Sequence, residues 1–249
     1  GATVTAERPI MLLTGASRGI GHATVKLFQQ RGWRILTVSR QAFSAECAWP
    51  EARESHIQAD LADLDGIERL AEEVRARLPD GKLHALVNNA GISPKSPERT
   101  RLGVIGTDAH AWTQVLNVNL VSTALLARAL LPEMERANGS IVNVTSIAGS
   151  RVHPFAGVAY AASKAGLAAL TREMAHEFGG RGVRANAIAP GEIETSILSP
   201  GTDALVAAEV PMGRLGNPAE VASTIYFLCS DASSYINGAE IHINGGQHV

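Results

Sequence analysis

The sequence predicts an α/β fold with a doubly wound parallel sheet and helices on both faces. Short apolar runs of strand length alternate with longer segments of helical spacing from one end of the chain to the other. No repeat, low-complexity tract or interdomain linker interrupts this alternation. We therefore expect residues 1–249 to form a single domain, because one α/β domain can reach this length.

The expected strands are brief, rich in Val, Ile or Leu, and bounded by Gly, Asn, Asp or Ser. They are Ile10–Thr14, Arg34–Val38, the weaker His56–Ala59, Leu83–Asn88, Ser140–Thr145 and Val183–Ile188. Good helix formers at helical spacing predict helices over Gly21–Arg31, Leu64–Arg77, Ala111–Ala137 and Ala161–Phe178. Two long segments, Ser93–His110 and Glu192–Pro218 with its short helical piece, interrupt the pattern and are expected to be functional loops.

Composition excludes several classes of protein. Hydrophobic residues make up 45% and charged residues 18%, an ordinary globular balance. The net charge is -2 without a basic run, so we expect neither a nucleic-acid nor a membrane partner. Cys47 and Cys229 lie far apart in no metal-ligand pattern, which indicates reduced thiols and no metal site. No signal-like N-terminus is seen, and no apolar run approaches the ~18 residues of a membrane span, so we expect a soluble cytoplasmic protein.

A glycine-rich turn follows the first strand. Its sequence is Thr14-Gly15-Ala16-Ser17-Arg18-Gly19-Ile20-Gly21, and a helix begins there. Glycines let backbone N–H groups approach a pyrophosphate, and the positive end of the helix then stabilises the anion. A bare structural turn would also use these glycines, so the turn by itself is a weak indication of dinucleotide binding.

The end of the second strand strengthens this interpretation and indicates NADP. An acidic residue at this point binds the ribose hydroxyls in NAD-binding sheets, but this chain has Ser39 followed by Arg40. Arg18 lies inside the glycine turn, and a guanidinium group pairs bidentately with a phosphate. Unless both arginines are merely solvated, they favour the 2′-phosphate of NADP over NAD.

Tyr160 and Lys164 are four residues apart near the start of a predicted helix and therefore share a face. An unperturbed phenol has a pKa near ~10, and a nearby ammonium group together with a nicotinamide cation would lower it. Ser146 follows a strand at the carboxyl edge of the sheet, where open parallel sheets bind ligands. Its hydroxyl could polarise a substrate carbonyl, or it could simply cap the loop.

Taken together, these motifs resemble the short-chain dehydrogenase/reductase family over nearly the whole chain. They are the glycine turn, Asn88-Asn89-Ala90-Gly91, Ser146, Tyr160-x-x-x-Lys164 and Pro190-Gly191 with Thr195. The resemblance implies a Rossmann-like dinucleotide-binding and catalytic domain with about seven strands, assembled as a tetramer or dimer. It also implies an oxidoreductase that transfers a hydride between NADP and a small carbonyl or alcohol substrate.

The resemblance further implies a role for each residue. Tyr160 is the acid or base, and Lys164 lowers its pKa and holds the nicotinamide ribose. Ser146 orients the substrate oxygen. Asn119, preferred over Asn117, holds a water behind the lysine. The remaining positions are expected to contact the cofactor: Gly15, Ser17, Arg18, Gly19, Ile20, Gly21, Ser39, Arg40, Asp60, Leu61, Asn88, Ala90, Gly91, Pro190, Gly191, Ile193 and Thr195.

Two departures from the family pattern limit the transfer of a substrate. Fourteen positions separate Ser146 from Tyr160, one more than is common, and the loop before Asn119, with Arg99, Arg101 and His110, is long. His153, His242 and His248 are expected to be structural or surface residues. The C-terminal tail, residues 245–249, is expected at a subunit interface.

Several functions stay open at this stage. The substrate could be a 3-oxoacyl group on a carrier, a sugar, a polyol or a ring ketone. A non-catalytic NADP sensor or scaffold is the main alternative, although such a protein usually loses the tyrosine or lysine. A sugar-nucleotide epimerase or dehydratase would need more chain after the sheet than is present here.

Overall fold

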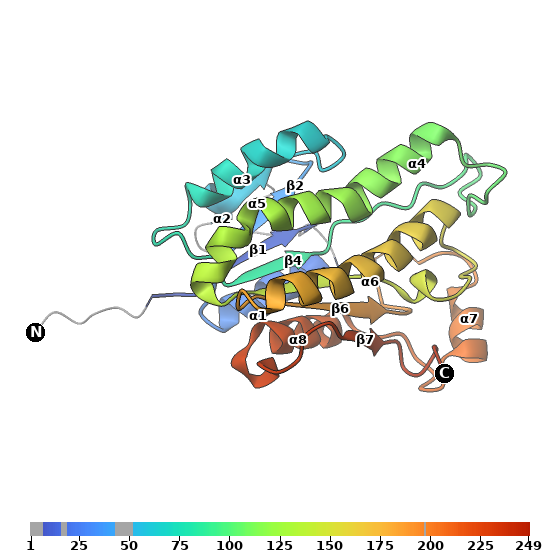
Figure 1. Cartoon of the computed structure of the whole chain (residues 1–249). Helices are drawn as coiled ribbons and strands as arrows, with labels where there is room; N and C mark the ends of the chain where they lie inside the picture. The colour runs from blue at the N-terminus through green and yellow to red at the C-terminus, as the bar shows by residue number, and fades with distance from the viewer. Residues whose placement is uncertain (1–6, 16–18, 43–51, 197) are drawn as a thin grey trace, which may run out of the picture.

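A computed structural model describes residues 7–15, 19–42, 52–196 and 198–249, and within them a seven-stranded parallel sheet forms the centre of the molecule (Figure 1). The strand order is β3-β2-β1-β4-β5-β6-β7. The order reverses between β1 and β4, which is where doubly wound sheets open a ligand-binding crevice. The predicted fold class is confirmed.

The strands lie close to the predicted segments, apart from one that was missed. They are β1 (Ile10–Thr14), β2 (Arg34–Ser39), β3 (His56–Gln58), β4 (Ala85–Asn88), β5 (Ser140–Val144), β6 (Arg184–Pro190) and β7 (Glu240–Ile243). No strand was assigned to β7 from the sequence, and all four of its residues are only half-buried. It is an edge strand that pairs with β6 alone, so its apolar signal is weak.

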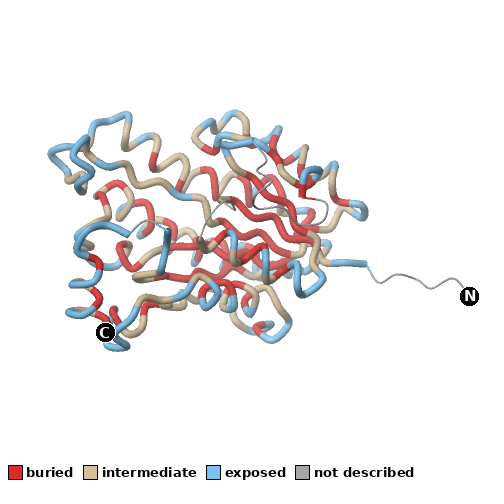
Figure 2. The backbone as a smooth tube through the Cα atoms, turned by 180° about the vertical axis from the view of Figure 1, so that it is seen from behind, coloured by how far each residue is buried: buried red, intermediate tan, exposed pale blue. Residues whose placement is uncertain are grey.

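Helices cover both faces of the sheet (Figure 1). They are α1 (Gly19–Gln30), α2 (Ala52–Ser55), α3 (Ile67–Arg75), α4 (Ala109–Leu116), α5 (Ser122–Ala137), α6 (Val158–Gly179), α7 (Thr202–Glu209) and α8 (Pro218–Cys229). The core has two halves because the central strands β1, β4 and β5 are buried on both faces (Figure 2). Leu12 packs with α3, α5 and α6, whereas Leu13 packs with α1 and α8.

The predicted helix Ala111–Ala137 is interrupted. Asp108 caps its start by accepting a hydrogen bond from the backbone of Ala111, and a π-helical turn over Asn117–Val121 separates α4 from α5. Contrary to the sequence expectation, Ala109–Ala137 contains a window long and apolar enough to cross a membrane. One such helix is weak evidence, since core helices pass the same test, and α5 packs against α3 and the sheet.

The sequence analysis also missed α8, although its beginning carries a capping signal. The side chain of Asn217 accepts a backbone hydrogen bond, and the Glu220 carboxylate accepts one from the backbone N–H of Asn217. Pro218 occupies the first turn. The helix buries Val221, Ile225 and Leu228 against the sheet. Cys229 at its end is a free thiol, and Cys47 lies outside the described residues.

Candidate active site

The turn after β1 is held by the chain that follows β4. The Thr14 hydroxyl accepts hydrogen bonds from the backbone N–H groups of Asn89 and Ala90, each 3.1 Å long. Gly15 has a φ of +73°, and a Cβ there would lie 2.9 Å from the Cα of Ala90. Only glycine fits this position, because both the backbone angle and the close approach exclude a side chain. The Asn89 amide completes the contact by donating to the carbonyl of Gly15 at 2.8 Å.

The N-terminus of α1 is suited to an anionic group. Gly19 begins the helix with a φ of +54° and has nothing within 4 Å of where its Cβ would be. The first turn contains no acidic residue that would oppose an anion. Gly21 is buried, and Ile20 packs on the core. The residues present therefore fit the pyrophosphate of a dinucleotide, whereas Ser17 and Arg18 lie outside the described residues.

The ends of β2 and β3 form the adjacent part of the edge. The Ser39 hydroxyl donates to the carbonyl of Gln41 at 2.9 Å, and Arg40 is exposed. The side chain of Asp60 accepts a 2.9 Å hydrogen bond from the backbone N–H of Ala62. The side chain of Leu61 is buried. The residue at the tip of β2 is thus a hydroxyl rather than a carboxylate.

The segment from Asn88 to Gly91 follows β4 at the same edge of the sheet. The side chain of Asn88 is buried and donates to the Asn143 side chain at 2.9 Å, linking β4 to β5. The expectation that Asn88 lines the adenosine side stays a prediction, and its side chain is engaged with Asn143. Gly91 lies beside Lys164, since a Cβ on this glycine would lie 3.3 Å from the lysine Nζ.

Asn119 lies in the π-helical turn, a distortion that often marks functional sites. Its amide accepts from the backbone N–H of Ile92 at 2.8 Å and donates to the carbonyl of the same residue at 3.0 Å. It also donates to Ser163, one residue before Lys164. Asn117 instead donates to the carbonyl of Ala62. The role of Asn119 in holding a water stays a prediction.

Ser146, Tyr160 and Lys164 come together beside the end of β5. The Tyr160 and Ser146 side chains are hydrogen-bonded, and the Lys164 ammonium lies 5.5 Å from the centre of the tyrosine ring. Lys164 is buried and donates to the carbonyl of Val144 at 2.7 Å. Ser146 also caps a short 3-10 turn, because its hydroxyl accepts from the backbone of Ala148 at 3.1 Å. The capping alternative is therefore observed, whereas the role of Ser146 toward a substrate carbonyl stays a prediction.

Burial shifts the pKa values of Tyr160 and Lys164 so that each side chain favours its neutral form. It raises the pKa of Tyr160, and the hydrogen bond with Ser146 opposes the rise. It lowers the pKa of Lys164 to about 8. The sequence argument expected the lysine to lower the tyrosine pKa, but in this structure desolvation of the phenol is the larger effect.

The segment after β6 closes the site from the other side. Pro190 is buried at the end of β6, and a Cβ on Gly191 would lie 2.5 Å from the Cβ of Asn244. Ile193 forms an isolated bridge with Gly216, while Thr195 is exposed. These contacts position the segment across the carboxyl edge of the sheet.

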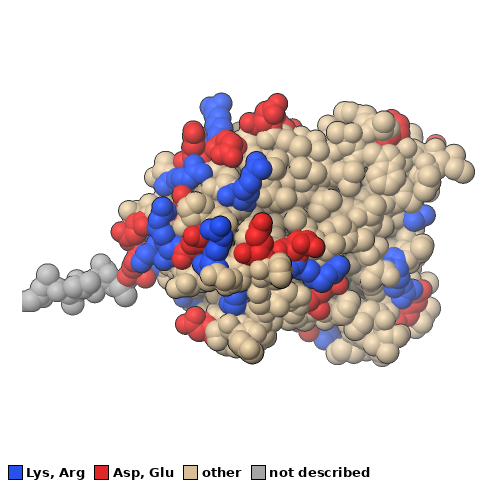
Figure 3. Space-filling model, in the orientation of Figure 1, with Lys and Arg blue, Asp and Glu red and all other residues tan. Residues whose placement is uncertain are grey.

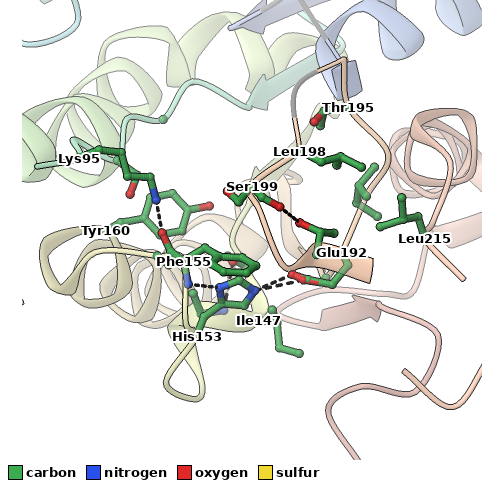
Figure 4. Close-up of a pocket in the computed structure, with 18 residues that line it drawn as sticks. Lys95, Ile147, His153, Phe155, Tyr160, Glu192, Thr195, Leu198, Ser199 and Leu215 are labelled. Carbon is green, nitrogen blue, oxygen red and sulfur yellow. Dashed lines mark hydrogen bonds and ion pairs between the residues drawn. The ribbon is translucent and has the colours of Figure 1, made fainter. Parts of the chain in front are cut away.

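A cavity of about 500 Å³ opens between these segments (Figure 4). It is lined by Gly91, Ser146 and Tyr160, and by both long loops. His153 and Glu192 also line it and contact each other, although the sequence analysis assigned His153 a structural role and did not single out Glu192. The sequence offered one indication that Glu192 lines the cavity, namely its position directly after Pro190-Gly191.

The comparisons agree with the fold and the motifs. The sequence model of a family described as enoyl-(acyl carrier protein) reductase matches residues 15–248. Protein FixR of Bradyrhizobium diazoefficiens is 57% identical over 98% of this chain and 88% of its own length. The 3-oxoacyl-[acyl-carrier-protein] reductase FabG of Thermotoga maritima is 37% identical over 96% of this chain and 98% of its own.

A solved structure gives the same assignment. An oxidoreductase of the short-chain dehydrogenase/reductase family from Brucella ovis, in complex with a partially ordered NAD, is 56% identical. It superimposes with a TM-score of 0.84 and covers 96% of this chain and 100% of its own. The chain belongs to the short-chain dehydrogenase/reductase family and is an NAD(P)-dependent dehydrogenase/reductase.

Proposed function

We propose that this protein is an NADP-dependent oxidoreductase that reduces a small ketone or aldehyde, or oxidises the corresponding alcohol. The observation that carries the proposal is the joint presence of Ser146, Tyr160 and Gly91 in the wall of one cavity, with Lys164 directly behind them. A non-catalytic sensor has no need of a phenol, a hydroxyl and a buried ammonium group at the same point.

The proposed mechanism assigns the proton to Tyr160. When bound, the nicotinamide supplies or accepts the hydride. Tyr160 donates a proton to the substrate oxygen during reduction and takes it back during oxidation, and Ser146 orients that oxygen by hydrogen bonding. Lys164, with a pKa of about 8, is mostly an ammonium at neutral pH and stabilises the phenolate. Asn119 fixes the backbone of Ile92 beside the lysine.

The preference for NADP rests on charge at the ends of β1 and β2. Ser39 repels no phosphate, Arg40 is exposed and able to pair with one, and Arg18 adds a second guanidinium to the turn in sequence. The solved relative from Brucella ovis holds NAD, so the preference needs a direct test. We expect NADPH to bind at least about tenfold more tightly than NADH, and Ser39→Asp to remove the difference. Equal affinities in the unmodified protein would contradict the assignment.

The substrate is proposed only as a class. A 3-oxoacyl group on a carrier is one version, as the name of the Thermotoga maritima relative suggests. Sugars, polyols and ring ketones are others, because both loops that line the cavity are unusually long. We further propose that the chain acts in the cytoplasm as a single domain within a homo-oligomer.

The decisive experiment follows NADPH absorbance with a panel of ketones, aldehydes, sugars and 3-oxoacyl thioesters. Tyr160→Phe is expected to lower kcat by about 100-fold or more, since it removes the proton donor but keeps the ring. Cofactor binding, followed by nicotinamide fluorescence, is expected to persist in the variant. Tight NADPH binding without turnover of any member of a broad panel would favour the sensor alternative.

A further inference from the structure

Glu192 and His153 form a buried pair in the wall of the cavity (Figure 4). The Nε2 atom of His153 lies 2.5 Å from Oε1 and 3.1 Å from Oε2 of Glu192. The two side chains are only 12% and 10% exposed. They come from the two loop segments that follow β5 and β6, so the contact joins opposite sides of the cavity mouth.

The hydrogen bonds of His153 assign its neutral form. Its Nδ1 atom accepts a 3.1 Å hydrogen bond from the backbone N–H of Phe155, so Nδ1 carries no proton. The proton is therefore on Nε2, which donates it to Glu192. The pair consists of a neutral imidazole and a carboxylate, and the negative charge of Glu192 is not balanced by His153.

Among the described residues, Glu192 makes no ion pair with a lysine or an arginine. Lys95, which also lines the cavity, donates its ammonium hydrogen bond to the carbonyl of Phe155 on the far side of the pair (Figure 4). Arg151 is paired with Glu209. A carboxylate can accept about four hydrogen bonds, and His153 is the only side chain of the described part that donates to Glu192. A largely buried anion thus keeps acceptor capacity toward the cavity.

We propose that Glu192 selects a substrate that carries a hydrogen-bond donor, either a hydroxyl or an ammonium group, close to the reacting carbonyl. This inference rests on the proposed function, because it takes Tyr160 and Ser146 to hold the carbonyl oxygen within the same cavity. A donor that reaches Glu192 compensates its charge, whereas a carboxylate is repelled. A 3-oxoacyl thioester offers only acceptors beside its ketone and gains nothing from this residue.

A purely structural role for the pair makes a different prediction. The contact could simply clamp the two loop segments together. Glu192→Gln separates the two roles, because glutamine keeps the size of the side chain and still accepts from Nε2 of His153 through its amide oxygen. The clamp then survives while the charge is lost. Glu194→Gln is the matched control, since Glu194 is exposed and lies two residues further along the chain.

The test uses three methyl ketones of nearly equal size, aminoacetone, hydroxyacetone and butanone, together with the larger, anionic acetoacetate. We expect Glu192→Gln to lower kcat/KM for aminoacetone by about tenfold or more, and for hydroxyacetone by less. Butanone should change little, acetoacetate should improve, and Glu194→Gln should leave all four values unchanged. A change by one common factor for all four ketones would show a clamp and overturn the inference.

A binding measurement keeps this inference separable from the proposed function. Ligand-observed NMR on the holoenzyme compares the amino alcohol derived from aminoacetone with the alcohol derived from butanone. Preferential binding of the amino alcohol that is lost in Glu192→Gln supports the role of Glu192 even without turnover, and the missing turnover then counts against the proposed function. Absence of any preference for the amino alcohol would overturn the inference, whether or not the ketones are reduced.

Discussion

Tyr160 and Lys164 share one face of α6, and burial opposes the charged form of each side chain. The Lys164 ammonium lies 5.5 Å from the centre of the Tyr160 ring, close enough for its positive charge to favour the phenolate. The backbone carbonyl of Val144 fixes the lysine at 2.7 Å. The position of the cation is therefore set by β5 rather than by the tyrosine.

Lys164 makes the stability of the protein depend on pH. Its pKa falls from 10.5 to about 8 on folding, so between these values the unfolded chain binds a proton that the folded chain has released. The free energy of unfolding therefore rises with pH across this window, by at most about 3 kcal/mol. Below the window the buried ammonium group carries its full destabilising effect.

Denaturant unfolding of the protein without cofactor, from pH 8 to 10.5, measures this contribution against Lys164→Met. The variant should lose the rise that the lysine produces. Lys26→Met, at an exposed position of α1, should keep it. Parallel pH curves for the unmodified protein and Lys164→Met would mean that burial does not shift this lysine.

At the scale of elements, the glycine turn has two constraints, a positive φ and a close contact with the chain after β4. Only the first of them could be predicted from the sequence. The pattern of glycines after β1 indicates a tight turn, and Gly15 and Gly19 do adopt positive φ. The contact of Gly15 with Ala90 could not be foreseen, because it depends on how closely β4 lies to β1. Gly32 offers a comparison: its φ is +81°, but nothing lies within 4 Å of its Cβ position.

Gly15→Ala and Gly32→Ala therefore separate the two effects. Gly32→Ala should lower the free energy of unfolding by about 1 kcal/mol, the usual effect of a side chain at positive φ. Gly15→Ala should lower it by at least about 1 kcal/mol more, and should also weaken cofactor binding, since Ala90 must move. Urea unfolding of both variants gives the comparison. Equal losses would argue against a backbone contact at Gly15.

The elements themselves were predictable where their burial is two-sided. Strands such as β1 and β5 are fully buried and mostly apolar, so their bounds follow closely from the sequence. By contrast, β7 is a half-buried edge strand with a polar residue at every second position, and it was missed. The proximity of Tyr160 and Lys164 was predictable from their spacing on α6. The Glu192–His153 pair was not, because it forms between two loops whose path the sequence pattern does not determine.

The capping signal of α8 gives a further prediction at this scale. Asn217 caps the helix that covers β5 and β6, so Asn217→Ala should lower the free energy of unfolding by about 1 kcal/mol. Asn217→Asp should retain most of the stability, because aspartate accepts the same backbone hydrogen bond. Thermal unfolding of the two variants provides the measurement. If both variants are as stable as the unmodified protein, Pro218 and the packing of α8 are enough to hold the start of the helix in place without the cap.

For the whole molecule, charge is unevenly distributed. In Figure 3 the lysines, arginines and acidic residues gather toward the end that carries the N-terminus, and the face over α4 and α6 shows few of them. Less than half of the most apolar window of the helix Ala109–Ala137 is buried within the chain. A large uncharged face of this kind is typical of a surface that meets another protein.

We expect this face to join copies of the chain in solution. Ala124 is half-buried on α5, between the exposed residues Thr113 and Arg128 along the helix. Ala124→Arg should place a charge in the interface and shift the mass measured by light scattering toward the 26.2 kDa protomer. Ala76→Arg, exposed at the end of α3, is the control and should leave the assembly intact. If the interface also holds α4 and the Asn119 turn in place, the activity per chain should fall in Ala124→Arg. A variant that dissociates but stays fully active would show that the oligomer contributes to stability and not to activity.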